Sequence, residues 1–162
     1  MIIRFGTGYF AVTIDLGGPK YTKKEVLEKS ITGDYEISKL ETKSPSTEWV
    51  CYLLKDTNND KEIAYIRGYH WGKETFHIQR IKNLLKDRIS GYRHIPKISK
   101  IMDEDLKKEG VKELTCSAYL KFAPMAMKRY GFRPDEKNTQ YIGRTWWRYV
   151  PLPWKPLKKK LD

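Results

Sequence analysis

Residue types that favour β-strands are concentrated in the middle of the chain. Glu48–Asp56 and Glu62–Trp71 are rich in aromatic and β-branched residues, and the turn-forming residues Thr57–Asp60 separate them. This pattern predicts a β-hairpin. In Thr75–Asn83, which follows a Gly-Lys turn, His77, Gln79 and Ile81 alternate with Phe76, Ile78 and Arg80, so we expect the three segments to form an antiparallel meander.

A helical period replaces the strand period after Pro96. Apolar residues between Ile98 and Leu106 recur at the spacing of one helix face, and Gly110 stands where a helix commonly ends. The short apolar segment Val111–Ala118 then predicts a strand. A second, shorter helix is expected over Phe122–Arg129.

The first part of the chain carries weaker signals. Ile2–Phe5 is expected to be a strand. Thr22 with Glu25 three residues later forms a capping-box pattern, which predicts a helix whose apolar face includes Val26 and Ile31. Residues 32–47 are polar and are expected to be mostly loop.

At the other end, Thr139–Leu152 is expected to be the last strand. Prolines at positions 151, 153 and 156 are expected to end regular structure. Residues 1–152 would then form one domain and residues 153–162 a basic tail. The fold class expected is α/β (α+β), with a mixed central sheet in which an antiparallel meander precedes helix, strand, helix and strand.

Positive charge changes this picture, because the net charge of +12 is unevenly placed. Residues 80–100 hold seven Lys and Arg residues against one acid, and residues 144–162 hold six against one. Concentrated charge of one sign favours an anionic partner, although a solvated basic terminus is the alternative. No run approaches a membrane span, no Cys/His cluster has metal spacing, and Cys51 and Cys116 are expected to be reduced core residues of a cytoplasmic protein.

The basic turn before the predicted helix is the strongest candidate for a binding site. Amide groups at a helix start favour phosphate, Gly91 allows close approach of the backbone, and Arg88 and Arg93 add positive charge. The turn therefore predicts a site for a diphosphate. The alternative is an ordinary strand–turn–helix in which Gly91 only eases the turn.

Two sequence segments in this order carry a family resemblance. Arg88-Ile89-Ser90-Gly91-Tyr92-Arg93 and Met127-Lys128-Arg129-Tyr130-Gly131-Phe132 resemble the two motifs of the GNAT superfamily of acyl-CoA-dependent N-acyltransferases. The resemblance covers roughly residues 49–152 and implies a GNAT-like fold that binds acetyl-CoA (CoA). It implies these cofactor contacts: Ile81, Asn83, Arg88, Ile89, Ser90, Gly91, Tyr92, Arg93 and His94.

The chain departs from the family's motifs at two positions. Arg93 stands where a small residue is usual, and Met127 stands where the family has the tyrosine that protonates the thiolate. Tyr130 is the candidate replacement for that acid, with core packing as the alternative. His77, whose ordinary pKa lies near neutrality, is the candidate base, with a structural role as its alternative and His70 and Glu74 as the next candidates.

The expected function is acyl transfer from acetyl-CoA to an amine. The basic segment Arg144–Lys160 suggests that the amine belongs to an anionic partner, such as RNA, tRNA or a nucleic-acid-bound protein. The main alternative is a catalytically degenerate GNAT-fold module that binds nucleic acid or protein through its basic surface. A third hypothesis is a synthase of the same fold that uses S-adenosylmethionine or another acyl group.

Overall fold

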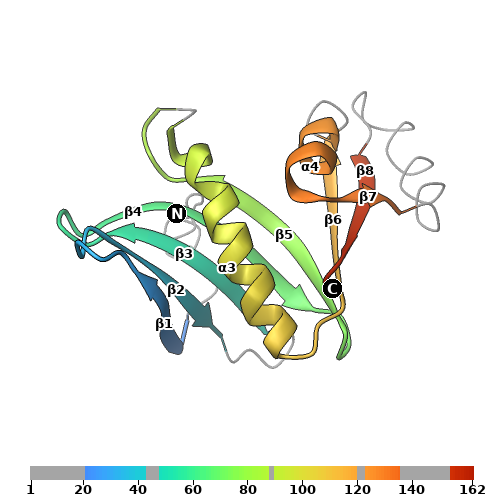
Figure 1. The fold of residues 1–162 in the computed structure, drawn as a ribbon, viewed down its shortest axis with the longest axis horizontal. Coiled ribbons are helices and arrows are strands. Elements are labelled where there is room, and N and C mark those ends of the chain that lie inside the picture. The colour runs from blue at the N-terminus through green and yellow to red at the C-terminus, as the bar shows by residue number, and fades with distance from the viewer. Residues whose placement is uncertain (1–20, 43–47, 88–89, 120–122, 136–153) are drawn as a thin grey trace. The chain divides into compact units, whose positions relative to one another are not determined.

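The computed structural model describes residues 21–42, 48–87, 90–119, 123–135 and 154–162. Its strands follow the hydrogen-bonded order β1-β2-β3-β4-β5-β6-β8-β7 (Figure 1). The chain divides into two compact units. The first unit contains the residues up to Tyr69 together with Arg80–Met102, and the second contains His70–Gln79 and the residues from Asp103 onward. The mixed sheet confirms the fold class expected from the sequence.

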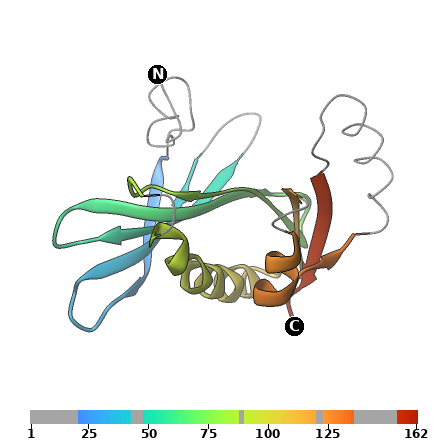
Figure 2. The ribbon, with the colours of Figure 1, turned by 90° about the horizontal axis from the view of Figure 1, so that it is seen from above.

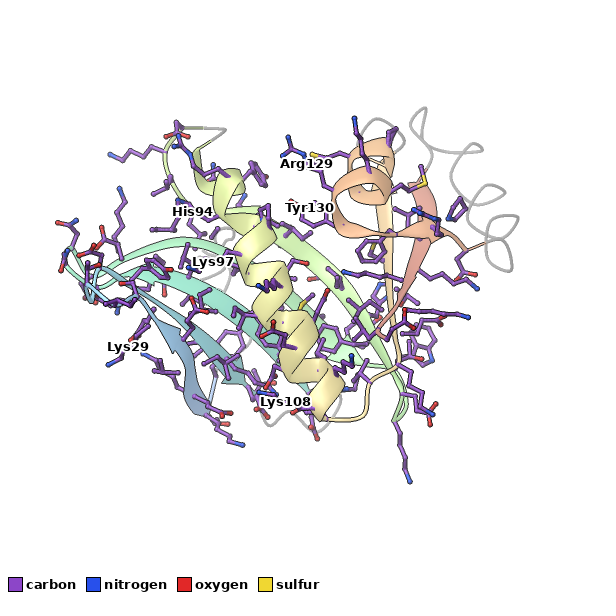
Figure 3. The ribbon with its side chains drawn as sticks, viewed as in Figure 1. Lys29, His94, Lys97, Lys108, Arg129 and Tyr130 are labelled. Carbon is purple, nitrogen blue, oxygen red and sulfur yellow. The ribbon has the colours of Figure 1, made fainter. Side chains whose placement is uncertain are left out.

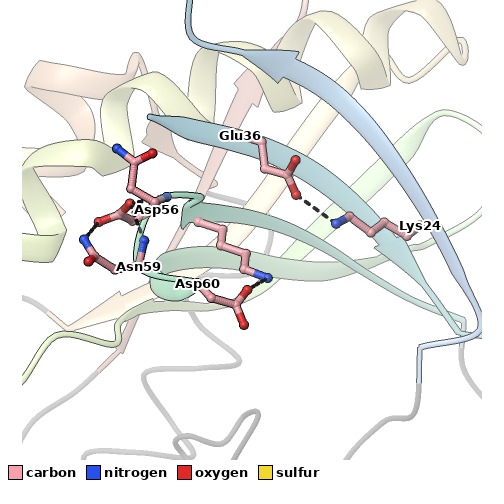
Figure 4. A network of polar contacts seen from close by, with 7 residues as sticks. Lys24, Glu36, Asp56, Asn59 and Asp60 are labelled. Carbon is pink, nitrogen blue, oxygen red and sulfur yellow. Dashed lines mark hydrogen bonds and ion pairs between the residues drawn. The ribbon is translucent and has the colours of Figure 1, made fainter. Parts of the chain in front are cut away.

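The predicted meander is confirmed. β3 (Trp49–Asp56) pairs antiparallel with β4 (Lys61–His70), and β5 (Thr75–Asn83) follows after a turn in which Trp71 N donates to Thr75 O over 2.8 Å. At the β3–β4 turn, the amides of Asn58 and Asn59 donate to Asp56 Oδ1. Figure 4 shows this turn, where Asp56 also accepts from the Asn59 side chain. The local turn chemistry thus closes the hairpin where the sequence places it.

The helix expected after Thr22 and the loop expected over residues 35–41 are both wrong. Lys23–Lys29 forms a strand, β1, and Tyr35–Glu41 forms its antiparallel partner, β2, which in turn pairs with β3. Ile31, expected on a buried helix face, is fully exposed, whereas Ile37 of β2 is fully buried. Tertiary pairing outweighs the local capping-box pattern here. A strand at this position completes the backbone hydrogen bonds of β3, and a loop would not.

A 3₁₀ turn, η1 (Ser90–His94), leads into the main helix, α3 (Ile95–Lys108). Gly110 follows α3 with a φ of 91°, a left-handed conformation that favours glycine. The Ile95–Met102 part of α3 lies along one face of the strands of the first unit (Figures 1 and 2). Lys97 fastens it there, because its Nζ lies 3.1 Å from Glu28 Oε2 of β1 and 4.3 Å from the centre of the Tyr35 ring of β2. The predicted helix and its end are confirmed.

In the second unit, β6 (Glu113–Tyr119) runs parallel to β5. Their pairing extends from Thr75 opposite Glu113 to Ile78 opposite Cys116, while β5 continues to Asn83 and β6 to Tyr119. The helix α4 (Ala123–Tyr130) and the short strand β7 (Arg133–Pro134) come next. The strand and short helix expected in this part of the chain are confirmed.

The end of the chain corrects a second prediction. Trp154–Lys160, expected to lie in an irregular tail, forms the strand β8, which pairs antiparallel with β6 along its whole length and with β7 on its other side. Pro156 is tolerated because it stands near the start of a strand whose pairing is otherwise continuous. The strands expected over Ile2–Phe5 and Thr139–Leu152 lie outside the described residues.

Each unit has its own buried apolar residues. In the first unit they include Ile37, Leu54, Ala64, Ile66 and Ile98, and in the second Phe76, Leu106, Leu114 and Leu157. Burial raises the pKa of both Cys51 and Cys116 to about 12, so both thiols stay protonated. None of the described helices has the length and apolar character that crossing a membrane requires.

Candidate functional sites

The turn that follows β5 is built around Asn83. Its side-chain amide donates to Asp87 O over 2.7 Å, and its Oδ1 accepts from Leu85 N over 2.9 Å. The side chain is 9% exposed. Asn83 therefore holds the turn by bridging its two ends, and only its main chain is left for the cofactor contact that the resemblance implies. Ile81, two residues earlier on β5, is 41% exposed.

The predicted phosphate-binding segment lies in the first unit. Of its seven residues, Arg88 and Ile89 lie outside the described part of the chain, and the main chain of Ser90–His94 forms η1. Tyr92 and Arg93 are exposed and His94 is half-buried. Burial and then the charge of Arg93 lower the pKa of His94. His94 comes directly before α3, and Lys97 lies in its first turn (Figure 3).

His77 lies in the second unit, on β5, with its register partner Thr115 beside it on β6. Its Nδ1 lies 2.8 Å from Thr115 Oγ1, and the Trp71 ring meets the imidazole edge to face at 6.3 Å. Burial lowers the pKa of His77, so the imidazole is neutral at physiological pH.

The next candidates for a base have structural partners instead. His70 packs edge to face on Phe76 at 5.2 Å and lies 3.6 Å from Glu109 Oε1. Glu74 accepts from Lys112 Nζ over 3.2 Å, and its main-chain carbonyl accepts from Lys112 N over 2.8 Å. These contacts fasten the β4–β5 turn.

Tyr130 is the last residue of α4 and is half-buried (Figure 3). Burial raises the pKa of its hydroxyl, which therefore keeps its proton at neutral pH. Arg133 fixes the end of this helix, because its Nη1 donates to Met127 O over 3.3 Å and to Phe132 O over 2.9 Å. Tyr130 thus sits on a capped helix terminus with a proton to donate.

Two features of the second unit escaped the sequence analysis. Lys158 is the register partner of Thr115, which places it in one row with His77. Its neighbour Lys159 forms an ion pair with Asp103 of α3, and burial raises the pKa of Asp103 in spite of that lysine. Both features depend on β8. Its apolar alternation is weak and prolines lie in and before it, so the sequence did not indicate a strand.

Neither protein-family models nor curated proteins give a match to this chain. Solved structures do. A GNAT family acetyltransferase from Elizabethkingia anophelis with acetyl-CoA bound is 21% identical with a TM-score of 0.52, over 70% of this chain and 76% of that one. An IAA acetyltransferase from Bacillus cereus is 17% identical with a TM-score of 0.52, over 70% and 78%. Nourseothricin acetyltransferase is 11% identical with a TM-score of 0.50, over 89% and 91%. The chain therefore has the fold of the GNAT acetyltransferases.

Proposed function

We propose that the protein is an N-acyltransferase that moves the acyl group of acetyl-CoA to an amine. The observation that carries this proposal is the fold, because every solved structure described above is an acetyltransferase and one of them holds acetyl-CoA. A shared fold does not by itself define an activity. The residues of this chain must therefore fit both the cofactor and the chemistry.

The donors around η1 suit a diphosphate. Arg93 presents an exposed guanidinium from η1, and the lone acid between Arg80 and Lys100, Asp87, uses its main-chain carbonyl to close the turn. Arginine binds phosphate oxygens through two parallel hydrogen bonds, and main-chain amides at a turn favour anions. We assign the diphosphate to Arg88–His94 and the extended arm of the cofactor to the main chain of Ile81 and Asn83.

Bound acetyl-CoA would supply an acyl thioester, and the protein would then have two protons to move. His77, neutral because of its burial, takes the proton from the attacking amine as the new C–N bond forms. Tyr130, whose hydroxyl keeps its proton, donates to the thiolate released when the C–S bond breaks. Thr115 orients His77 through the contact at Nδ1.

Binding tests the cofactor assignment directly. Acetyl-CoA and CoA are titrated by calorimetry and by thermal shift into the wild type and into Arg93→Ala, with Lys100→Ala as the matched control on exposed α3 surface. A ligand at a hundred times its Kd adds about 2.7 kcal/mol to the free energy of unfolding, which raises the melting temperature measurably. We expect Arg93→Ala to weaken binding and Lys100→Ala to leave it unchanged. Absence of a shift with either ligand in the wild type would overturn the proposal.

The second candidate function is a binding module for an anionic macromolecule. The observation that favours it is β8, where Lys160 is exposed and Lys158 has no carboxylate partner among the described residues. Such a module would bind RNA with an affinity that falls steeply as salt rises. Titration of RNA at several salt concentrations, with Lys158→Gln/Lys160→Gln as the comparison, separates it from the enzyme. Salt-steep binding without any acetyl-CoA binding would favour the module.

A further inference from the structure

Four side chains of the second unit form one row across four strands. The registers pair His77 of β5 with Thr115 of β6, Thr115 with Lys158 of β8, and Lys158 with Arg133 of β7. Register partners lie on the same face of a sheet, with neighbouring strands about 4.8 Å apart. The backbone of Lys158 therefore lies about 10 Å from that of His77, two strands along.

The neighbouring residue Lys159 identifies the face that carries this row. Lys159 pairs with Asp103 of α3, and its Cε lies 3.6 Å from the place where a Cβ on Gly131 would stand. Consecutive strand residues point to opposite faces. The row that contains His77 and Lys158 is therefore on the face turned away from Asp103 and Gly131.

Among the described lysines of the second unit that form no ion pair, Lys158 is half-buried, whereas Lys73, Lys107, Lys108, Lys128 and Lys160 are exposed. Lys159 forms an ion pair with Asp103, and Lys112 forms one with Glu74. Lys158 is half-buried and forms no ion pair with any residue that the structure describes. A partly desolvated cation gains from an anion brought to it, because the attraction is screened less there than on the open surface. At the end of the row, Arg133 already donates hydrogen bonds from Nη1 to the main-chain carbonyls of Met127 and Phe132.

We infer that Lys158 determines acceptor specificity: it binds an anionic group, carboxylate or phosphate, on the molecule whose amine gives its proton to His77. This inference rests on the proposed function and adds the substrate class. The two side chains stand side by side about 10 Å apart, which, less one hydrogen-bond length at each end, suits an acceptor in which a few bonds separate amine and anion. An acceptor with a second ammonium group would instead be repelled by Lys158.

Acceptors of matched length measure this preference. We would compare kcat/KM for δ-aminovalerate, pentylamine and cadaverine, which carry a carboxylate, a methyl group and an ammonium at the far end, and for aminobutyl phosphate. The wild type is expected to prefer the carboxylate or the phosphate acceptor over pentylamine by about threefold or more, and to use cadaverine worst. The ratio of the two anionic acceptors tells carboxylate from phosphate.

Variants of β8 then assign the preference to Lys158. Lys158→Gln should bring the three carbon-chain acceptors to similar kcat/KM values, mainly through KM, and Lys158→Arg should retain the preference. Lys160→Gln is the matched control, since it removes an exposed lysine of the same strand and face, in the row that pairs with Glu113 instead of Thr115. Melting temperatures close to that of the wild type would show that the variants fold.

The possible outcomes separate the two proposals. Transfer to pentylamine without a preference for anionic acceptors, or a preference that survives in Lys158→Gln, would overturn the role of Lys158 and leave the acyltransferase standing. Failure to bind acetyl-CoA and to acylate any of the amines would overturn the proposed function and this inference with it.

Discussion

Thr115 Oγ1 lies 2.8 Å from Nδ1 of His77, and the two residues are direct partners across the parallel pairing of β5 with β6. A hydroxyl at this distance hydrogen-bonds to Nδ1 and holds the orientation of the ring. The contact comes from two segments that only the fold brings together.

Thr115→Val tests the consequence of this contact for activity. The change keeps the shape of the side chain and removes the hydroxyl, so His77 loses the partner of Nδ1. We expect kcat to fall by about tenfold or more, within the range that general-base catalysis contributes. Activity should be lost as pH falls through the pKa of His77, because burial lowers that pKa and the neutral ring is the active form. The pH profile of kcat/KM should move in Thr115→Val and return in Thr115→Ser, and an unchanged profile would contradict the role of Thr115.

Ile37→Ala tests whether residues 35–41 form a core strand. Ile37 is fully buried between the strands of the first unit, and Ile31 is fully exposed beyond the end of β1. Replacing a buried isoleucine by alanine typically lowers the free energy of unfolding by about 2–5 kcal/mol, whereas replacing an exposed one lowers it by about 0.5 kcal/mol or less. Urea unfolding of Ile37→Ala and Ile31→Ala should reproduce this difference. Equal losses would favour the helix that the capping box predicts.

Gly131→Ala should destabilise the end of α4. Gly131 has a φ of 78°, and its missing Cβ would lie 3.6 Å from Lys159 Cε, which is ordinary contact. The cost is therefore conformational, about 1–2 kcal/mol for a residue with a side chain in the left-handed region. Gly131→Asn should lose less, since asparagine tolerates that region better. Denaturant midpoints of the two variants measure the difference, and equal stability of Gly131→Ala and the wild type would disprove the strain.

Asp103 makes stability depend on pH in a defined direction. Burial raises the pKa of this carboxyl group in the folded protein, and the charge of Lys159 only partly opposes the effect. At pH values between the unfolded pKa and the raised folded pKa, the folded state therefore holds a proton on Asp103 that the unfolded state has released. Stability from this group is fully present below the unfolded pKa, near 4, and is lost as pH rises through the raised pKa. Asp103→Asn should remove that slope, which unfolding experiments between pH values of about 3 and 7 would detect as a flatter curve than that of the wild type.

Short-range patterns account for the parts of the fold that the sequence predicted well. The β3–β4 turn depends on Asp56 and the two asparagines after it, and α3 ends at a glycine with positive φ. The same kind of local pattern placed a helix at Lys23–Lys29, and there it was wrong. A capping box contributes little free energy compared with the hydrogen bonds and buried apolar surface that β1 and β2 gain by pairing beside β3.

By itself, the sequence determined the meander, the helix that follows it, the basic turn between these two, and the short helix ending at Tyr130. Each of these depends on residues that are close neighbours in the sequence. Only the tertiary structure decided that Trp154–Lys160 is a strand and that Lys158 stands in line with Thr115 and His77. Register between distant segments has no local signal, since it depends on which apolar faces are buried together once the whole sheet forms. For that reason the candidate base was visible in the sequence, and the residues that we propose as its partners, Thr115 and Lys158, were not.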